Sequence, residues 1–147
     1  MPKLIKDRSI VEDSFTLLKI NEDGSLPTVP ASGDVIVPLA VWTAQKDALL
    51  ARQGQTGVWI DSHEEVEDLG SDASKFAVVA VNFPAFTDGR GFSTGRLLRE
   101  RYGYQGELRA IGDVFKDLLY FMLRCGFNAF VVREDKDIDE ALKGLND

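Results

Sequence analysis

The sequence predicts an α/β fold, which is a single domain of alternating strands and helices. Three observations support this. The chain has 147 residues and is 44% apolar, which is typical of one domain with a real core. From Asp34 onward, strand-like and helix-like segments alternate. Residues 76–81, FAVVAV, form an apolar run typical of a strand buried on both faces. We therefore predict a mainly parallel sheet of four or five strands, open or half-barrel-like.

The chain divides into two parts. Residues 1–33 are polar and irregular, apart from the apolar run FTLLKI at 15–20 and a predicted turn at 21–25, NEDGS. We interpret residues 1–33 as an N-terminal arm or hairpin. Residues 34–147 form the predicted α/β domain.

The alternation begins with a short strand over 35–37. A helix is predicted over 39–52, because Pro38 precedes it and Gly54 follows it. A second strand follows over 56–60. The sequence SHEE at 62–65 has the form of a capping box and predicts the start of a short helix.

The second half continues in the same way after the strand at 76–81. Asp113 is a predicted N-cap, Gly126 a predicted helix end, and Asp137 with Glu140 a predicted cap of the last helix. The remaining expected elements are a loop over 82–92, a helix over 94–102, a strand over 107–111, a helix over 113–125 and a strand over 128–133.

Charge and composition exclude several functions. The net charge is −7, which argues against a general nucleic-acid binder. One Cys and one His exclude an intrachain disulfide, a multi-cysteine metal site and a two-histidine metal site, so we predict no metal. We interpret Cys125 as a packing residue and His63 as exposed. No apolar run approaches the ~20 residues of a membrane span, and no signal peptide is visible, so we expect a cytoplasmic protein without membrane contact.

One segment is basic within this acidic chain. Residues 82–125 carry 7 basic and 5 acidic side chains, and six of the basic ones are Arg, whose planar donor fork suits oxyanions. Residues 86–96, FTDGRGFSTGR, predict a glycine-rich turn that enters a helix and presents N–H groups to an anion. We predict that the segment binds sulfite, sulfate or phosphate through Asp88, Gly89, Arg90, Gly91, Ser93, Arg96, Arg99 and Arg109.

Other interpretations of this segment stay open. It could be a partner-docking loop or a purely structural loop, and Arg96 could pair with Glu100 on a solvated helix face. It lacks the patterns of a phosphate-binding P-loop and of a dinucleotide-binding turn. We therefore predict no cofactor, while flavin or nicotinamide binding without such a pattern stays open.

Polar residues follow several predicted strands. In parallel α/β folds, ligands gather outside the carboxyl ends of the strands. Asp61, Asn82, Asp113, Arg133 and Glu134 occupy such positions. We take Asp61, Asp88 and Asp113 as candidate acid–base groups, with a structural role for Asp113 as the alternative.

The helix expected over 114–124, VFKDLLYFMLR, has seven Val, Phe, Leu or Met residues among its eleven. Such a helix is deeply buried or lies in an interface. A homodimer contact through Val114–Arg124 is therefore one prediction, and core packing is the other.

Three segments together resemble a known family. They are FPAFTDGRGFS at 83–93, GELRAIGD at 106–113 and RCGFNAF at 124–130. They resemble a bacterial family of domains of unknown function, number 934, whose members are often labelled oxidoreductases involved in sulfite reduction. The resemblance implies a role in sulfur metabolism beside a sulfite or nitrite reductase. The resemblance does not identify a mechanism, a cofactor or a set of catalytic residues.

These observations lead to three hypotheses. The first is an accessory protein of assimilatory sulfite reduction that binds a small oxyanion, the reductase, or both through residues 86–99. The second is a small enzyme with acid–base Asp residues and with Arg90 or Arg109 as an anion clamp. The third is a homodimeric interaction module. Whether the chain is an enzyme stays open, because one Cys and one His cannot supply the ligands of siroheme or an iron–sulfur cluster.

Overall fold

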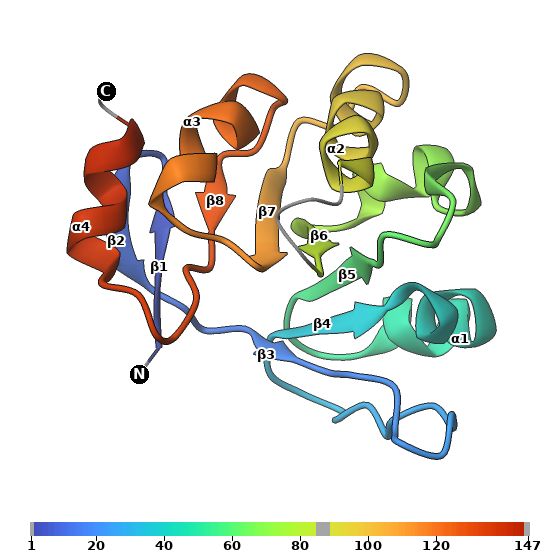
Figure 1. The fold of residues 1–147 in the computed structure, drawn as a ribbon. Helices are drawn as coiled ribbons and strands as arrows, with labels where there is room; N and C mark the ends of the chain where they lie inside the picture. The colour runs from blue at the N-terminus through green and yellow to red at the C-terminus, as the bar shows by residue number, and fades with distance from the viewer. Residues whose placement is uncertain (1, 85–88, 146–147) are drawn as a thin grey trace.

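The computed structural model describes residues 2–84 and 89–145. Its centre is one sheet that curls into an open half-barrel (Figure 1). The predicted α/β class, the mainly parallel sheet and the half-barrel-like shape are confirmed, but the strand number is wrong, because the sheet has eight strands rather than four or five. In sheet order these are β2 (Ser9–Glu12), β1 (Lys3–Lys6), β8 (Ala129–Phe130), β7 (Glu107–Gly112), β6 (Val78–Phe83), β5 (Thr56–Ile60), β4 (Val35–Pro38) and β3 (Thr16–Leu17).

Three of the additional strands come from the first 17 residues. Strands β1 and β2 form an antiparallel hairpin, in which Asp7 and Arg8 turn the chain with positive φ values of 50° and 67°. Strand β1 also pairs antiparallel with β8, while β3 pairs parallel with β4 at the opposite edge of the sheet. Strands β1 and β3 pair with strands far along the chain, whereas β2 pairs only with β1 in the local hairpin.

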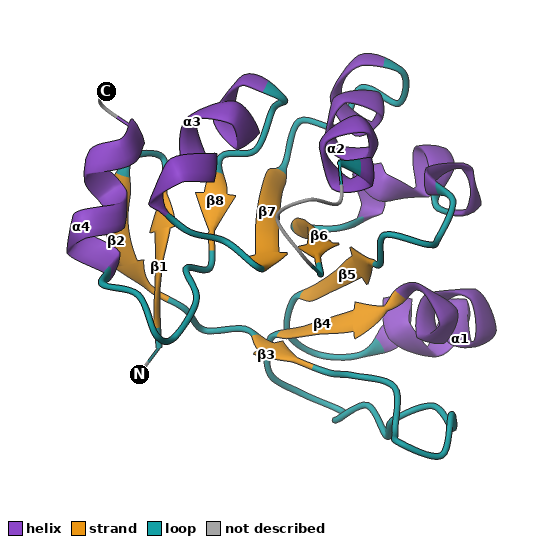
Figure 2. Cartoon of the chain, in the orientation of Figure 1, coloured by secondary structure: helices purple, strands orange, loops and turns teal. Residues whose placement is uncertain are grey.

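All helices pack on the convex side of the sheet (Figure 2). From β4 to β8, each strand lies beside the one before it, and right-handed crossovers in such an order place the helices between these strands on the same face. Helix α4 follows β8 and packs against α3, β1 and β2. The helical segments are α1 (Leu39–Ala51), η1 (Val66–Asp68), η2 (Gly70–Lys75), α2 (Arg90–Glu100), α3 (Lys116–Arg124), α4 (Ile138–Leu142) and η3 (Lys143–Leu145).

The larger core lies between the sheet and these helices. Alternate strand residues such as Val58, Val79 and Leu108 point into it and are fully buried. Their neighbours along the strands point to the concave side, where Ile36, Val78, Ala80 and Ile111 form a smaller cluster. Within the described residues, no helix lies on this concave side (Figure 2).

Helix α2 begins at Arg90, whereas the sequence predicts a helix from Thr94. Gly91 and Gly95 therefore lie inside the helix and are buried. A Cβ at Gly91 would collide with the ring of Phe83, and a Cβ at Gly95 would collide with the ring of Phe127. These glycines let α2 lie close to two aromatic rings, a tertiary effect that outweighs their low helix propensity.

Two predicted helix starts are wrong. Helix α3 begins at Lys116 with Phe115 at its N-cap position, and the carboxylate of Asp113 binds another partner. The capping-box segment forms a turn in which the Asp61 backbone N–H donates to Glu64 Oε1 over 2.7 Å, and 3₁₀ turns follow from Val66. In both cases a side chain near the expected helix start, Asp113 or Glu64, accepts a hydrogen bond from a group outside a helix N-terminus.

The last predicted cap is confirmed. The Asp137 carboxylate accepts hydrogen bonds from the backbone N–H groups of Asp139 and Glu140 at the start of α4. None of the helices in the described residues is long and apolar enough to cross a membrane.

Candidate functional site

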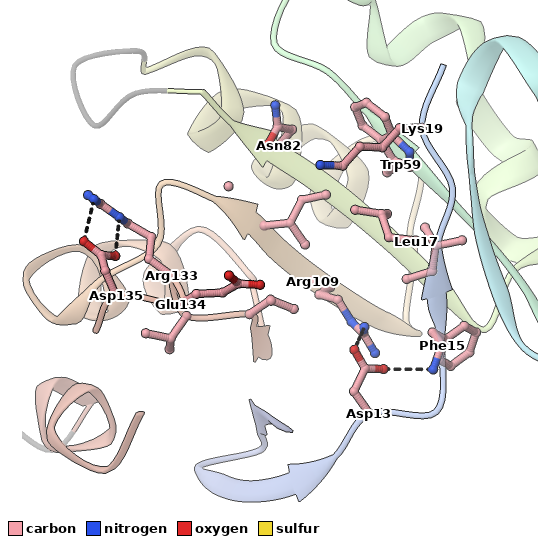
Figure 3. Close-up of a pocket in the computed structure, with 15 residues that line it drawn as sticks. Asp13, Phe15, Leu17, Lys19, Trp59, Asn82, Arg109, Arg133, Glu134 and Asp135 are labelled. Atoms are coloured by element: carbon pink, nitrogen blue, oxygen red, sulfur yellow. Dashed lines mark hydrogen bonds and ion pairs between the residues drawn. The ribbon is translucent and has the colours of Figure 1, made fainter. Parts of the chain in front are cut away.

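The concave side of the half-barrel holds a groove of about 690 Å³. Figure 3 shows its lining, which comes from strands β4 to β7, from the chain after β8 and from the segment that contains β3. We call residues 13–19 of that segment the strap. The groove is lined by Asp13, Phe15, Leu17, Lys19, Ile36, Trp59, Asn82, Arg109, Ile111, Gly112, Val131, Val132, Arg133, Glu134 and Asp135.

Strand register arranges the lining in layers. Successive residues of a strand point to opposite faces, so every second residue reaches the groove. Arg109 of β7 lies beside Ala80 of β6, and Ile111 lies beside Asn82 one layer nearer the carboxyl ends of the strands. Because the strands from β3 to β8 are parallel, their carboxyl ends form one edge, which we call the mouth of the groove.

The opposite, closed end contains a buried network of charges. Arg109 is only 3% exposed, and it donates from Nε to Glu107 Oε2 over 2.7 Å and from Nη1 to Asp13 Oδ2 over 3.0 Å. Its guanidinium lies 5.4 Å from the ring centre of Phe15. Lys6 pairs with the other Glu107 oxygen over 3.2 Å. Two cations and two carboxylates balance, which is what makes burial of these charges tolerable.

One atom of this network has no partner. Among the hydrogen bonds of the described residues, Arg109 makes none through Nη2, although the residue lines the groove. A guanidinium nitrogen always carries hydrogens to donate. The closed end therefore presents a spare donor to whatever occupies the groove.

The strap forms one wall of the groove. Trp59 Nε1 donates to the backbone oxygen of Leu18 over 2.8 Å, and Leu18 N–H donates to Ile36 O over 2.9 Å. These bonds hold Phe15 and Leu17 against the sheet, where they pack on the concave cluster. Lys19 is exposed and extends from the strap over the groove toward Asn82 (Figure 3).

The mouth gathers polar residues that follow the strands, as the sequence predicts. Asn82 Nδ2 donates to Asp61 Oδ1 over 3.1 Å. Arg133 donates from Nη1 to Asp113 Oδ1 over 2.7 Å, and its Nε and Nη2 bind the two Asp135 oxygens over 3.1 and 2.9 Å. The carboxylates of Asp135 and Asp113 raise the pKa of Arg133. Both described acid–base candidates, Asp61 and Asp113, therefore already have hydrogen-bonding partners.

The predicted anion-binding residues are not brought together in one place. Arg109 lies at the closed end of the concave groove, whereas α2 lies on the convex side. Arg99 donates to the backbone oxygens of Gly126, Tyr104 and Gly106 over 2.7–2.9 Å, and burial lowers its pKa. These three carbonyls give Arg99 a structural role that links α2 to two neighbouring loops.

The other members of the predicted set lie around the start and the outer face of α2. Gly89 precedes the helix, and Arg90 Nη2 donates to Ser62 Oγ over 3.4 Å. Ser93 and Arg96 are exposed, and Arg96 contacts Cys125 Sγ over 3.9 Å rather than pairing with Glu100. Asp88 lies outside the described residues. Oxyanion binding by this segment stays a prediction.

His63 is exposed, with Nδ1 at 3.9 Å from Asp61 Oδ2. In residues 2–84 and 89–145, no group of three or more His, Cys, Asp or Glu side chains could hold a metal ion.

Sequence reasoning missed the strap. Phe15, Leu17 and Lys19 alternate along the chain and face the same side of the sheet, and Trp59 lies on the adjacent wall. The period of two in FTLLK was a signal for this, but the run is short and lies in a polar context. The groove therefore includes a wall formed by residues 13–19, which the sequence predicts only as part of an N-terminal arm or hairpin.

Comparison with known proteins gives one family. The family described as "Bacterial protein of unknown function (DUF934)" matches residues 57–147. This range includes β5 apart from Thr56, β6 to β8 and α2 to α4, and hence most of the groove, but not the strap. No protein with curated annotation matches the chain.

Proposed function

Because this chain belongs to the family "Bacterial protein of unknown function (DUF934)", we propose a function from its own groove: the chain is a binding protein that holds a small organic molecule on the concave side of the half-barrel. The observation that carries this proposal is the open groove of about 690 Å³. Small-molecule sites are typically apolar clefts of about 300–1,000 Å³ with a few placed polar groups. Sulfite, sulfate or phosphate alone would leave most of this volume empty.

The proposed place in metabolism is that of an accessory protein in sulfite reduction, with a sulfite or nitrite reductase as partner. The family resemblance supports this part of the proposal, and the groove supports the binding activity. The two parts are separable, because the chain could bind its ligand with or without a reductase present.

A groove-filling variant tests the binding activity. Val131 is half-buried at the groove, so Val131→Trp places an indole in the space. The control is Val11→Trp on β2, where Val11 is 36% exposed and does not line the groove. We expect members of a small-molecule library to raise the melting temperature of the wild type and of Val11→Trp but not of Val131→Trp.

Two outcomes would count against the groove as the ligand site. One is that no compound at millimolar concentration shifts the wild type. The other is that the same shifts persist in Val131→Trp. Circular dichroism and urea unfolding check that the variant folds, and Leu17→Trp on the strap replaces it if it does not.

A second candidate function is that of an interaction module, which the exposed face of α3 favours. Phe121 is 60% exposed and Tyr120 is 41% exposed, and the Arg124 guanidinium lies 5.9 Å from the Tyr120 ring centre. Exposed aromatic rings beside Arg are typical of protein interfaces. This surface is proposed as the contact between two copies of the chain.

A further inference from the structure

We infer that the ligand of the groove is an organic anion, with an apolar ring-sized body between Trp59 and Ile111 and an anionic group, such as a carboxylate or sulfonate, bound by Lys19. This inference rests on the proposed function and names the class of molecule that the groove would take.

The walls of the groove select the body of the ligand. Phe15, Leu17 and Trp59 line one side, and Ile111 and Val131 line the other. Phe15, Leu17, Trp59 and Val131 are only half-buried, so their apolar surface still faces the groove. A rigid apolar body would remove this surface from water, which contributes about 25 cal/mol per Å².

The charges of the lining select the ligand's polar group. Six charged side chains line the groove, and four of them are paired with each other: Asp13 with Arg109, and Asp135 with Arg133. Lys19 and Glu134 form no ion pair within the described part of the chain. Lys19 therefore carries a charge on the wall that no ion pair with a residue in 2–84 or 89–145 neutralises.

Position separates Lys19 from Glu134. The Lys19 side chain extends over the groove toward Asn82 (Figure 3), and it lies beside Trp59 on the wall that receives the ring. Glu134 is exposed and follows β8, and its carboxylate also points toward the groove, on the side opposite Lys19 (Figure 3). An ammonium beside an apolar wall binds an anion more strongly than in open water. Glu134 would act on the same ligand only as a weak repulsive charge.

The closed end adds a second donor. Arg109 is nearly fully buried, and its Nη2 has no hydrogen bond to the described residues. An acceptor oxygen on the inner end of the ligand would pair with this nitrogen. The ligand would thus find an accessible guanidinium donor at the closed end, an apolar body site in the middle and an ammonium on the strap wall.

Two naphthalene dyes test the inference. 1-Anilinonaphthalene-8-sulfonate carries a sulfonate, and N-phenyl-1-naphthylamine is the same ring system without it. Each is titrated into the wild type and the variants, with fluorescence and calorimetry as readouts. The variants are Lys19→Gln, Glu134→Gln, Val131→Trp and the control Lys46→Gln, which removes an equal charge from α1 on the convex side.

The inference predicts a specific pattern. The wild type and Lys46→Gln bind one sulfonate dye with the same affinity. Lys19→Gln weakens the sulfonate dye about fivefold, since one exposed charge-assisted contact is lost, and leaves the neutral dye unchanged. Glu134→Gln tightens the sulfonate dye slightly, by about twofold. Val131→Trp abolishes binding of both dyes.

The contrary outcomes are distinct. Equal affinity of the sulfonate dye for the wild type and Lys19→Gln, or weaker binding to Glu134→Gln, overturns the anion inference and leaves the groove as a binding site. If the wild type binds neither dye, or if Val131→Trp binds both as the wild type does, the anion inference and the proposed function both fail. A stoichiometry of one, together with variants whose urea midpoints without dye equal that of the wild type, distinguishes binding in the groove from binding to unfolded chains.

Discussion

Asp13 and Arg109 lie 96 positions apart in the sequence and form a 3.0 Å ion pair that closes one end of the groove. Asp13 leads into β3 at one edge of the sheet, and Arg109 projects from β7 near its middle. The pair therefore joins the segment before β3 to a central strand across the concave side. The side chains of Asp13 and Arg109 are only 12% and 4% exposed, so the effect of breaking this pair on the free energy of unfolding differs from that of breaking a surface ion pair.

Arg109→Met would leave Asp13 and Glu107 without their shared guanidinium. We expect the free energy of unfolding to fall by about 3–5 kcal/mol, because the buried Asp13 carboxylate loses its ion-pair partner, while Glu107 keeps only Lys6. Equilibrium urea unfolding measures this change. The control is Arg101→Met, which removes an exposed 3.6 Å contact with Glu67 and should cost less than about 1 kcal/mol. Similar losses in the two variants would contradict the importance of the network.

Gly95→Ala tests the role of the glycines in α2. A methyl group at Gly95 meets the ring of Phe127, which is itself fully buried, so we expect a loss of about 1–3 kcal/mol in unfolding free energy. Gly89→Ala is the matched control, because nothing lies within 4 Å of a Cβ there and φ is −81°. A stable Gly95→Ala variant would show that close packing of α2 does not require this glycine.

Asp34 should make stability depend on pH. Its carboxylate accepts hydrogen bonds from the Gln55 backbone N–H over 2.9 Å and from Ser14 Oγ over 2.9 Å, and these, Gln55 first, lower the pKa of Asp34 below 3.8. A carboxylate with a lowered folded-state pKa stabilises the fold above its unfolded pKa, and this stabilisation is lost as the pH falls through the folded value.

Asp34→Ala should therefore cost about 1 kcal/mol at neutral pH, and this cost should shrink well below pH 3.8. Urea unfolding of both proteins across this range gives the difference at each pH. A cost that stays constant down to the lowest pH would show that the carboxylate charge is not involved.

Phe121→Ser tests the exposed face of α3. If two copies meet there, light scattering should give a dimer for the wild type and a monomer for the variant. The stability of the monomer fold should change by less than about 0.5 kcal/mol, because Phe121 is 60% exposed. Leu50→Ser on α1 is the control, since Leu50 is 56% exposed on another helix. A wild type that is monomeric at high concentration would rule out this dimer.

Local patterns predicted the elements whose causes are local. The strands β4, β5 and β7 follow apolar runs bounded by turns, and the Asp137 cap satisfies N–H groups two and three residues away. The prediction that polar strand ends share one edge is also confirmed, because it follows from parallel order alone.

The rest depends on partners far along the chain. Strand β3 has two residues and exists because β4 pairs with it. Helix α2 starts earlier than predicted because Phe83 and Phe127 pack against its glycines. Asp113 does not cap a helix, because its carboxylate accepts a hydrogen bond from Arg133, 20 residues away. Lys19 and Trp59 line one groove because β3 and β5 both pair with β4. No pattern within a short window of sequence encodes these relations.

The pairing of β1 with β8 has a consequence for synthesis. Ile5 of β1 lies opposite Phe130, so a ribosome releases Ile5 125 residues before its partner. Until then, the β1–β2 hairpin has no neighbouring strand to cover the free edge of β1, and an isolated two-stranded hairpin is marginally stable. The strands from β4 to β8 can add in order as they emerge, whereas the hairpin must wait for the last of them. Closure of this long loop is therefore expected to be the final and slowest step of folding.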